Sequence, residues 1–239
     1  MQRIPEPELM ETAEQAAAYA NADFAAPHAR FIELFREAFP DAAITGEALD
    51  AGCGPGDIAL RFARAFPQCH VVGVDGSAEM LRHGREILLR QPPELRNRIS
   101  LVQGLLPAPE LHGQKFDTII CNSLLHHLHD PRVMWQTVRN FARPGARVFV
   151  VDLRRPDCAE DARKLMELYG GGEPEILRRD FYNSLLAAFS PDEIREQLTA
   201  AGFGHFQVRV VSDRHVMVWG RKEAKTDSTF GHPSSICFL

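Results

Sequence analysis

The chain lacks the features by which membrane, disulfide-rich and nucleic-acid-binding proteins are recognised. It holds no run of 18 apolar residues, so we expect no membrane insertion. Its five cysteines are odd in number and dispersed, which argues against a disulfide framework and a cysteine metal cluster. Lys and Arg form no block and the net charge is −5, which argues against a nucleic-acid substrate. The first ten residues lack the basic and apolar regions of a signal peptide, so we expect a cytoplasmic protein.

What the chain does have is the composition and patterning of a globular α/β protein. Its 239 residues are 45% hydrophobic and 25% charged, enough for one domain with a full core. From residue 47 onwards, short β-branched strands alternate with helices, which predicts a parallel sheet with right-handed crossovers. The expected strands are 47–51, 70–75, 99–104, 116–122 and 146–153. The expected helices are 57–66, 77–90 and 131–142, the last N-capped by Asp130 with Pro131 at its first position.

The two ends of the chain depart from this alternation. Residues 10–39 read helical, and Pro27 is expected to split them into two helices. Near the other end, a capping box at Ser190 begins a helix, and the runs 206–211 and 215–220 are predicted to form an antiparallel hairpin.

A further interruption lies between the fifth strand and that last helix. Residues 156–188 are expected to form a helical cover at the carboxyl end of the sheet, where open α/β folds bind ligands. We therefore divide the chain into an N-terminal helical cap over 1–44, a main domain over 45–222 and a disordered tail over 223–239.

The most informative segment is a glycine-rich turn after the first strand, residues 49–57, with the sequence LDAGCGPGD. Its three glycines stand at alternate positions, where missing Cβ atoms let backbone N–H groups approach a ligand. The second strand ends in Asp75, 25 residues after Asp50, and a carboxylate there suits a ribose diol. The Gly-x-Gly-x-Gly spacing disfavours an NAD(P) dehydrogenase, whose turn reads Gly-x-Gly-x-x-Gly.

Four segments in order resemble motifs of the class I S-adenosylmethionine-dependent methyltransferases, particularly the small-molecule branch with the ubiquinone/menaquinone-type enzymes. They are 50–56 (DAGCGPG), 75–77 (DGS), 116–131 (FDTIICNSLLHHLHDP) and 143–148 (RPGARV). The resemblance covers roughly residues 45–153. It implies a Rossmann-like three-layer sandwich whose seven-stranded, mostly parallel sheet ends in the hairpin. It also implies S-adenosylmethionine as cofactor, S-adenosylhomocysteine as product, and no metal.

The resemblance carries cofactor contacts to named positions. They are Asp50, Gly52, Cys53, Gly54, Asp75, Gly76, Met80, Gly104, Leu105, Asn122 and Tyr19. Asp75 would accept both ribose hydroxyls, Met80 would pack near the adenine, and Asn122 would bound the methionine amino group. Leu105 departs from the family, because many relatives carry Asp there to accept from the adenine amine. Tyr19 either closes over the cofactor or only packs within its helix.

Chemistry at a sulfonium methyl needs little more than an aligned nucleophile and exclusion of water. If the nucleophile must lose a proton, His126 and His127 at the end of the fourth strand are the candidate catalytic residues. The alternative is that they are merely hydrogen-bonded loop histidines. Candidate substrate-binding residues are Tyr182, Asn183, Arg154 and His215. Each of these four residues can also be explained as an ordinary core or surface residue with no role in binding.

Absent motifs narrow the acceptor. Residues 122–125 read NSLL in place of the Asn/Asp-Pro-Pro-Tyr of enzymes that methylate planar amines, and the Pro-Cys of cytosine-carbon methylation does not occur there. We therefore expect methyl transfer to the O, N, S or C atom of a small molecule. Two alternatives stay open: a methyltransferase-fold protein that binds without turnover, and a methyltransferase of RNA or protein. The sequence leaves monomer and homodimer equally open.

Overall fold

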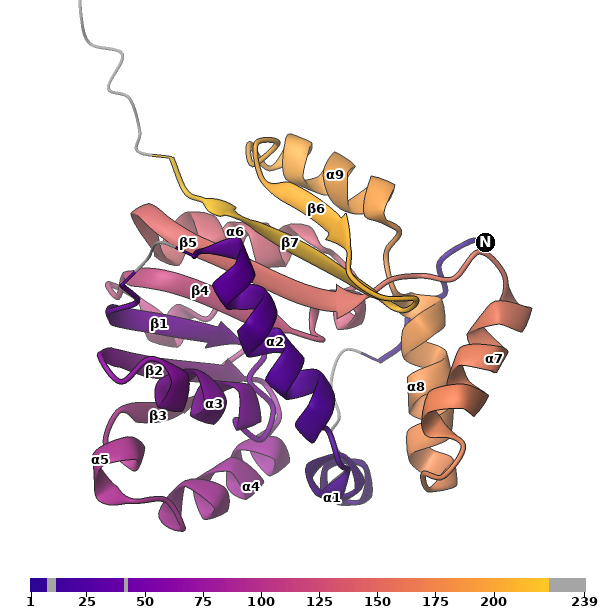
Figure 1. Ribbon diagram of the computed structural model, residues 1–239, viewed down its shortest axis with the longest axis horizontal. Helices are drawn as coiled ribbons and strands as arrows, with labels where there is room; N and C mark the ends of the chain where they lie inside the picture. Colours follow the sequence, from indigo (N-terminus) through magenta and orange to yellow (C-terminus); the bar gives the residue numbers. More distant parts are fainter. Residues whose placement is uncertain (8–11, 41–42, 224–239) are drawn as a thin grey trace, which may run out of the picture.

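A seven-stranded sheet forms the centre of the molecule (Figure 1). The structure, a computed structural model, describes residues 1–7, 12–40 and 43–223. Along the sheet the strands follow the order β3-β2-β1-β4-β5-β7-β6. They are β1 (Gly46–Ala51), β2 (Cys69–Asp75), β3 (Ile99–Gln103), β4 (Phe116–Asn122), β5 (Ala142–Leu153), β6 (Gln207–Val210) and β7 (His215–Arg221). Strand β7 runs antiparallel to both neighbours and the other pairings are parallel, which confirms the predicted fold class.

Helices cover both faces of this sheet (Figure 1). They are α1 (Ala13–Asn21), α2 (Ala25–Ala38), α3 (Asp57–Ala65), α4 (Ala78–Leu89), α5 (Pro93–Arg96), α6 (Arg132–Phe141), α7 (Ala159–Gly170), α8 (Glu175–Ala187) and α9 (Pro191–Ala200), with short 3-10 turns η1 (Pro109–Leu111) and η2 (Leu125–His127). Among the described residues, no helix combines the length and apolar character that a membrane crossing requires.

The alternation of side chains along the strands builds two separate cores. Ile120 and Phe149 face α2 and α3. There Phe35 meets the rings of Phe62 and Phe149 edge-on, with ring centroids 5.0 and 5.3 Å apart. Ile119 and Val148 point to the opposite face, against α6 and α9. Helices on both faces leave the carboxyl ends of the parallel strands as the open edge at which a ligand can bind.

Local signals set most helix starts. Ser77 caps α4 by accepting from the Met80 amide at 3.3 Å, and Ser190 begins α9 with the predicted capping box. Pro27 does not break the N-terminal helix as predicted. It lies in the first turn of α2, where its missing N–H costs nothing, and the break falls before Ala25. Helix α6 starts one residue later than predicted, at Arg132.

The predicted cover is a helical hairpin of α7 and α8 beyond the carboxyl ends of the strands (Figure 1). Residues 1–7, here called the N-terminal strap, run along α8. The Ile4 amide donates to Leu186 O at 3.0 Å, and Arg3 Nε donates to Ala187 O at 2.5 Å. The predicted domain boundaries stay predictions, and 224–239 of the predicted tail lies outside the described residues.

Candidate active site

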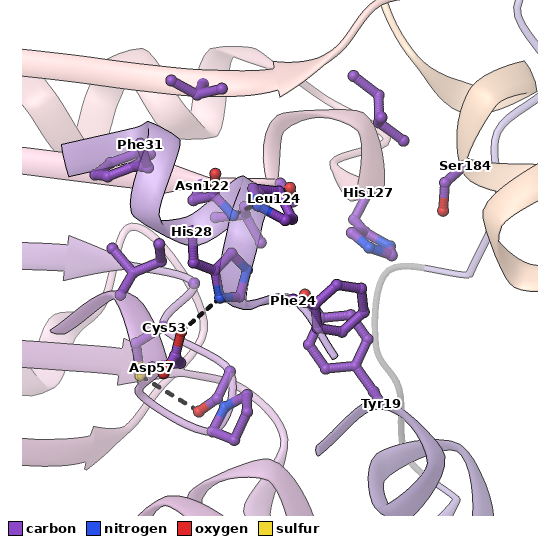
Figure 2. Close-up of a pocket in the computed structure, with 18 of the residues that line it drawn as sticks. Tyr19, Phe24, His28, Phe31, Cys53, Asp57, Asn122, Leu124, His127 and Ser184 are labelled. Carbon is purple, nitrogen blue, oxygen red and sulfur yellow. Dashed lines mark hydrogen bonds and ion pairs between the residues drawn. The ribbon is translucent and has the colours of Figure 1, made fainter. Parts of the chain in front are cut away.

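A cavity of about 680 Å³ opens at the carboxyl ends of β1, β2, β4 and β5. The glycine loop forms one wall, α1 and α2 form another, and α8 closes the far side (Figure 2). This volume lies within the range of roughly 300–1,000 Å³ that is usual for small-molecule sites. The topology therefore places a ligand-sized space where the sequence predicted one.

The glycine loop is held against β2 by main-chain hydrogen bonds. Gly52 and Cys53 donate to Val74 O at 2.9 and 3.0 Å, and Gly54 donates to Asp75 Oδ2 at 2.8 Å. Gly54 has a φ of +52°, and a Cβ there would meet no atom within 4 Å. At Gly52, by contrast, a Cβ would lie 2.6 Å from Leu124 Cδ2. The loop thus presents bare backbone to open space at Gly54 and needs glycine for packing at Gly52.

Asp75 ends β2 with acceptor capacity to spare. Its Oδ2 accepts from Gly54 and its Oδ1 accepts from the Ser77 amide at 2.8 Å. A carboxylate offers about four lone-pair positions, so two remain for a ligand. Burial raises the pKa of Asp75, although the two amide hydrogen bonds oppose that rise.

Asp50 is a buried carboxyl group on the cavity wall. Asp50 is only 1% exposed, and among the described residues its Oδ2 has no hydrogen-bond partner. Burial, and then the charge of Asp75, raises the pKa of Asp50 to about 8. At neutral pH this shift favours the protonated, uncharged form of the group.

His126 and His127 stand side by side on η2, with ring centroids 4.3 Å apart. His126 Nδ1 is hydrogen-bonded to Asp152, whose carboxylate also accepts from the Leu125 and Leu153 amides, both at 2.6 Å. Burial acts to lower the pKa of His126, but the charges of Asp152 and Glu6 outweigh it and raise that pKa.

The pKa of His127 moves in the opposite direction. Burial and, after it, the neighbouring charge of His126 together lower it to about 3. Both rings line the cavity, and Figure 2 shows His127 turned toward the space in front of Tyr19. The pair therefore consists of one imidazole paired with carboxylates and one neutral imidazole.

The family profile of the methyltransferase domain matches residues 49–148. An uncharacterized methyltransferase of Mycobacterium tuberculosis is 32% identical over 175 residues, which cover 72% of this chain and 85% of that protein. The chain belongs to the class I methyltransferases.

Other relatives of this methyltransferase match over a shorter length. The ubiquinone/menaquinone biosynthesis C-methyltransferase UbiE of Syntrophotalea carbinolica is 35% identical over 111 residues, and the match spans 46% of this chain and 45% of that protein. The match to it is thus confined to less than half of either chain.

Solved structures support the fold. The plantazolicin methyltransferase BpumL, solved in complex with SAH, superposes with a TM-score of 0.65 at 14% identity over 88% of this chain and 90% of that one. A SAM-dependent methyltransferase of Aquifex aeolicus gives 0.63 at 16% identity, over 88% of this chain and 98% of that one.

In this methyltransferase every predicted cofactor position lines the cavity. They are Asp50, Gly52, Cys53, Gly54, Asp75, Gly76, Met80, Gly104, Leu105, Asn122 and Tyr19. Tyr19 packs on Phe24, with ring centroids 4.7 Å apart, and burial raises its pKa to about 12, so its hydroxyl stays neutral. Leu105 is 62% exposed, so the site is open to solvent at this position.

The predicted substrate residues separate into two groups. His215 lines the cavity, and its Nδ1 lies 2.9 Å from Ser212 Oγ. Burial lowers the pKa of His215 to about 4. Tyr182, Asn183 and Arg154 do not line the cavity.

Helix and strand geometry explains why these three residues lie off the cavity wall. The residues of α8 that line the cavity follow helical spacing, and they are Leu177, Asp180, Phe181 and Ser184. Tyr182 and Asn183 fall between these positions, and Tyr182 packs on the cluster around Leu185. Arg154 follows the cavity-lining Leu153 and points away, its Nε donating to Asp213 O at 3.1 Å.

Three polar side chains at or behind the site were not predicted from the sequence. Asp152 carried a signal, because it is a carboxylate near the end of an apolar strand, as Asp75 is. His28 Nδ1 lies 2.6 Å from Asp57 Oδ2 on the cavity wall (Figure 2), and Arg61 Nε donates to the same oxygen at 2.6 Å. Glu6 carried no signal, since it reaches the site only through the path of the N-terminal strap.

Proposed function

We propose that this chain binds S-adenosylmethionine along the glycine loop and Asp75 and transfers its methyl group to a small-molecule acceptor. Membership of the methyltransferase family supports the reaction class. The observation that carries the proposal is the 2.8 Å hydrogen bond from Gly54 to Asp75, formed on the cavity wall beside the open face of Gly54. A backbone cradle beside a carboxylate with free lone pairs is what a ribose diol requires.

The rest of the wall suits the other parts of this cofactor. The Asp50 oxygen without a partner offers a hydrogen bond to the polar methionine end, together with the Asn122 side chain on the same wall. Met80 and Leu105 supply apolar contact on the adenine side. When bound, the cofactor supplies an electrophilic sulfonium methyl. No described residue has to generate that electrophile, so the cavity wall need only bind and orient the cofactor.

The work of the remaining residues is to position the acceptor and keep out water. Tyr19 and Phe24 form an aromatic wall at the mouth, and Phe181 and Leu177 face it from α8. We place the acceptor between these two walls. His127 faces this space and can accept a hydrogen bond from the nucleophilic atom of the acceptor, which orients its lone pair.

Calorimetric titration of S-adenosylmethionine and S-adenosylhomocysteine tests the binding half. Asp75→Asn keeps the shape of the side chain but removes its charge. Hydrogen bonds to a charged group are worth about 1.5–3 kcal/mol, so we expect Kd to rise roughly 10- to 150-fold. The matched control is Asp192→Asn, on the exposed first turn of α9, which should bind as the wild type does. Equal affinity in all three proteins would contradict the proposal.

Product formation tests the transfer half. S-adenosylhomocysteine should accumulate when wild-type protein is incubated with S-adenosylmethionine and a small-molecule acceptor. His127→Ala should bind the cofactor with little change and turn over more slowly, because His127 belongs to the acceptor side. Cofactor binding without product across an acceptor panel would instead favour a binding protein. Loss of cofactor binding in His127→Ala would refute this separation of roles.

A further inference from the structure

A second group of ligand-type side chains lies where the N-terminal strap meets η2. Glu6, His126 and His127 each offer one ligand atom, and these atoms all lie within 4.8 Å of one another. Glu6 Oε1 is 3.6 Å from His126 Nε2 and 3.4 Å from His127 Nδ1. Ligand atoms bound to a tetrahedral Zn²⁺ at ordinary bond lengths lie about 3.3 Å apart. Both distances from Glu6 are close to that spacing, and the ligand atoms of the two histidines lie within 4.8 Å of each other.

His126 has a carboxylate hydrogen-bonded to its far ring nitrogen, as metal-binding histidines usually do. Asp152 holds His126 Nδ1, and this leaves Nε2 directed at Glu6. Asp152 is itself fixed by two main-chain amides, at 2.6 Å each. A carboxylate behind the ring sets the tautomer and orientation of a ligating imidazole. The orientation of His126 is therefore set before any ion arrives.

The charge of the cluster also suits a cation. The Glu6 side chain is 9% exposed, and within the described part of the chain no Lys or Arg side chain forms an ion pair with it. Arg3 is near, but its Nη2 donates to the main-chain carbonyls of His126 and Leu128, at 2.8 and 3.0 Å. Among the described residues, Glu6 has His126 and His127 as its ion-pair partners. A divalent ion held by all three side chains would take the place of that pairing, since buried carboxylates are normally paired or bound to metals.

We propose that Glu6, His126 and His127 form a binding site for a divalent metal ion of the zinc class. Two histidines and one glutamate are the ligands of one kind of catalytic zinc site, which keeps a fourth position open. His126, His127 and Ser184 line the cavity, whereas Glu6 does not, so the open position faces the cavity. The Ser184 hydroxyl donates to Glu6 Oε1 at 2.9 Å and steadies that ligand.

This site deepens the proposed function and rests on it for its role. At its open coordination position, the ion would hold an oxygen, nitrogen or sulfur donor of the acceptor. Metal coordination lowers the pKa of bound water to about 7, and the pKa of a coordinated hydroxyl or thiol would be lowered in the same direction. The site also differs from the sequence-based expectation of no metal, because its ligands are 120 residues apart in the chain.

Equilibrium dialysis of the untagged full chain against Zn²⁺ tests the site directly, with Co²⁺ as a spectroscopic probe of coordination. We expect one ion per chain and the visible bands of tetrahedral Co²⁺. Glu6→Gln and His127→Ala should weaken Zn²⁺ binding by more than about 100-fold. Asp152→Asn, which changes the group that orients His126, should weaken it by roughly 10- to 100-fold. The matched control His83→Ala, a partly exposed histidine on α4, should bind as the wild type does.

The outcomes separate this inference from the proposed function. Equal Zn²⁺ occupancy in wild type, Glu6→Gln and His127→Ala, or none in the wild type, would overturn the metal site. Circular dichroism checks that each variant folds, and Glu6→Gln keeps the test valid if His127→Ala does not fold. S-adenosylmethionine titration on the same samples reports on the proposed function alone. Cofactor binding without Zn²⁺ binding refutes only the metal site, whereas Zn²⁺ binding without cofactor binding refutes only the cofactor proposal.

Discussion

Asp50→Asn is the substitution whose effect follows most directly from the structure. The Asp50 side chain lies on the cavity wall, 1% of the residue is exposed, and its Oδ2 has no partner among the described residues. Burial raises its pKa from the ordinary value of 3.8 to about 8. Asparagine has nearly the same shape and does not ionise in this range. The substitution therefore removes one titration and changes little else.

The sign and size of the effect follow from proton linkage. Between about pH 4 and pH 8 the folded protein holds a proton on Asp50 that the unfolded chain has already released. The contribution of this group to the free energy of unfolding therefore falls as pH rises through that window, by up to about 1.4 kcal/mol per pH unit. Asparagine has no such dependence. From pH 5 to pH 7, we expect Asp50→Asn to gain roughly 2–3 kcal/mol relative to the wild type.

Urea unfolding of the ligand-free protein, followed by circular dichroism at pH 5, 6 and 7, measures this difference. The control is Asp192→Asn, whose side chain is 88% exposed and which should show no such trend. A stability difference between Asp50→Asn and wild type that is constant across pH would refute the reasoning. It would mean that Asp50 ionises in the folded protein as it does in the unfolded chain.

Two further substitutions test the local structure around the site. Ser190→Ala removes the hydroxyl that accepts from the Glu193 amide at 3.2 Å, and with it the capping box of α9. The free energy of unfolding, measured in urea, should therefore fall by about 1 kcal/mol. An unchanged value would show that the cap does not contribute to stability here. Gly52→Ala places a Cβ 2.6 Å from Leu124 Cδ2 at a φ of +72°, so we expect a loss of about 1–2 kcal/mol from backbone strain alone, together with weaker cofactor binding in calorimetry. Wild-type stability and affinity in Gly52→Ala would contradict the close packing of this loop.

The sequence by itself determined the order of the main strands and helices along the chain and the side of the cavity that we propose for the cofactor. Both depend on short-range signals. Glycines at alternate positions, Asp75 at the end of an apolar strand and the cap at Ser190 act within a few residues of where they stand. The carboxyl ends of parallel strands meet at one edge of the sheet, so the glycine loop and Asp75 had to converge there.

The side of the cavity proposed for the acceptor was decided by the tertiary structure. Spacing in the sequence shows that α8 has an apolar face, but not which of its faces turns to the cavity. Tyr182 and Asn183 were predicted as substrate residues, whereas Phe181 and Ser184 line the cavity. Glu6 meets the histidine pair only because the N-terminal strap runs along α8. The raised pKa of Asp50 likewise arises from burial. Contacts between distant segments and the loss of water around a charge exist only once the chain has folded, and no local pattern encodes them.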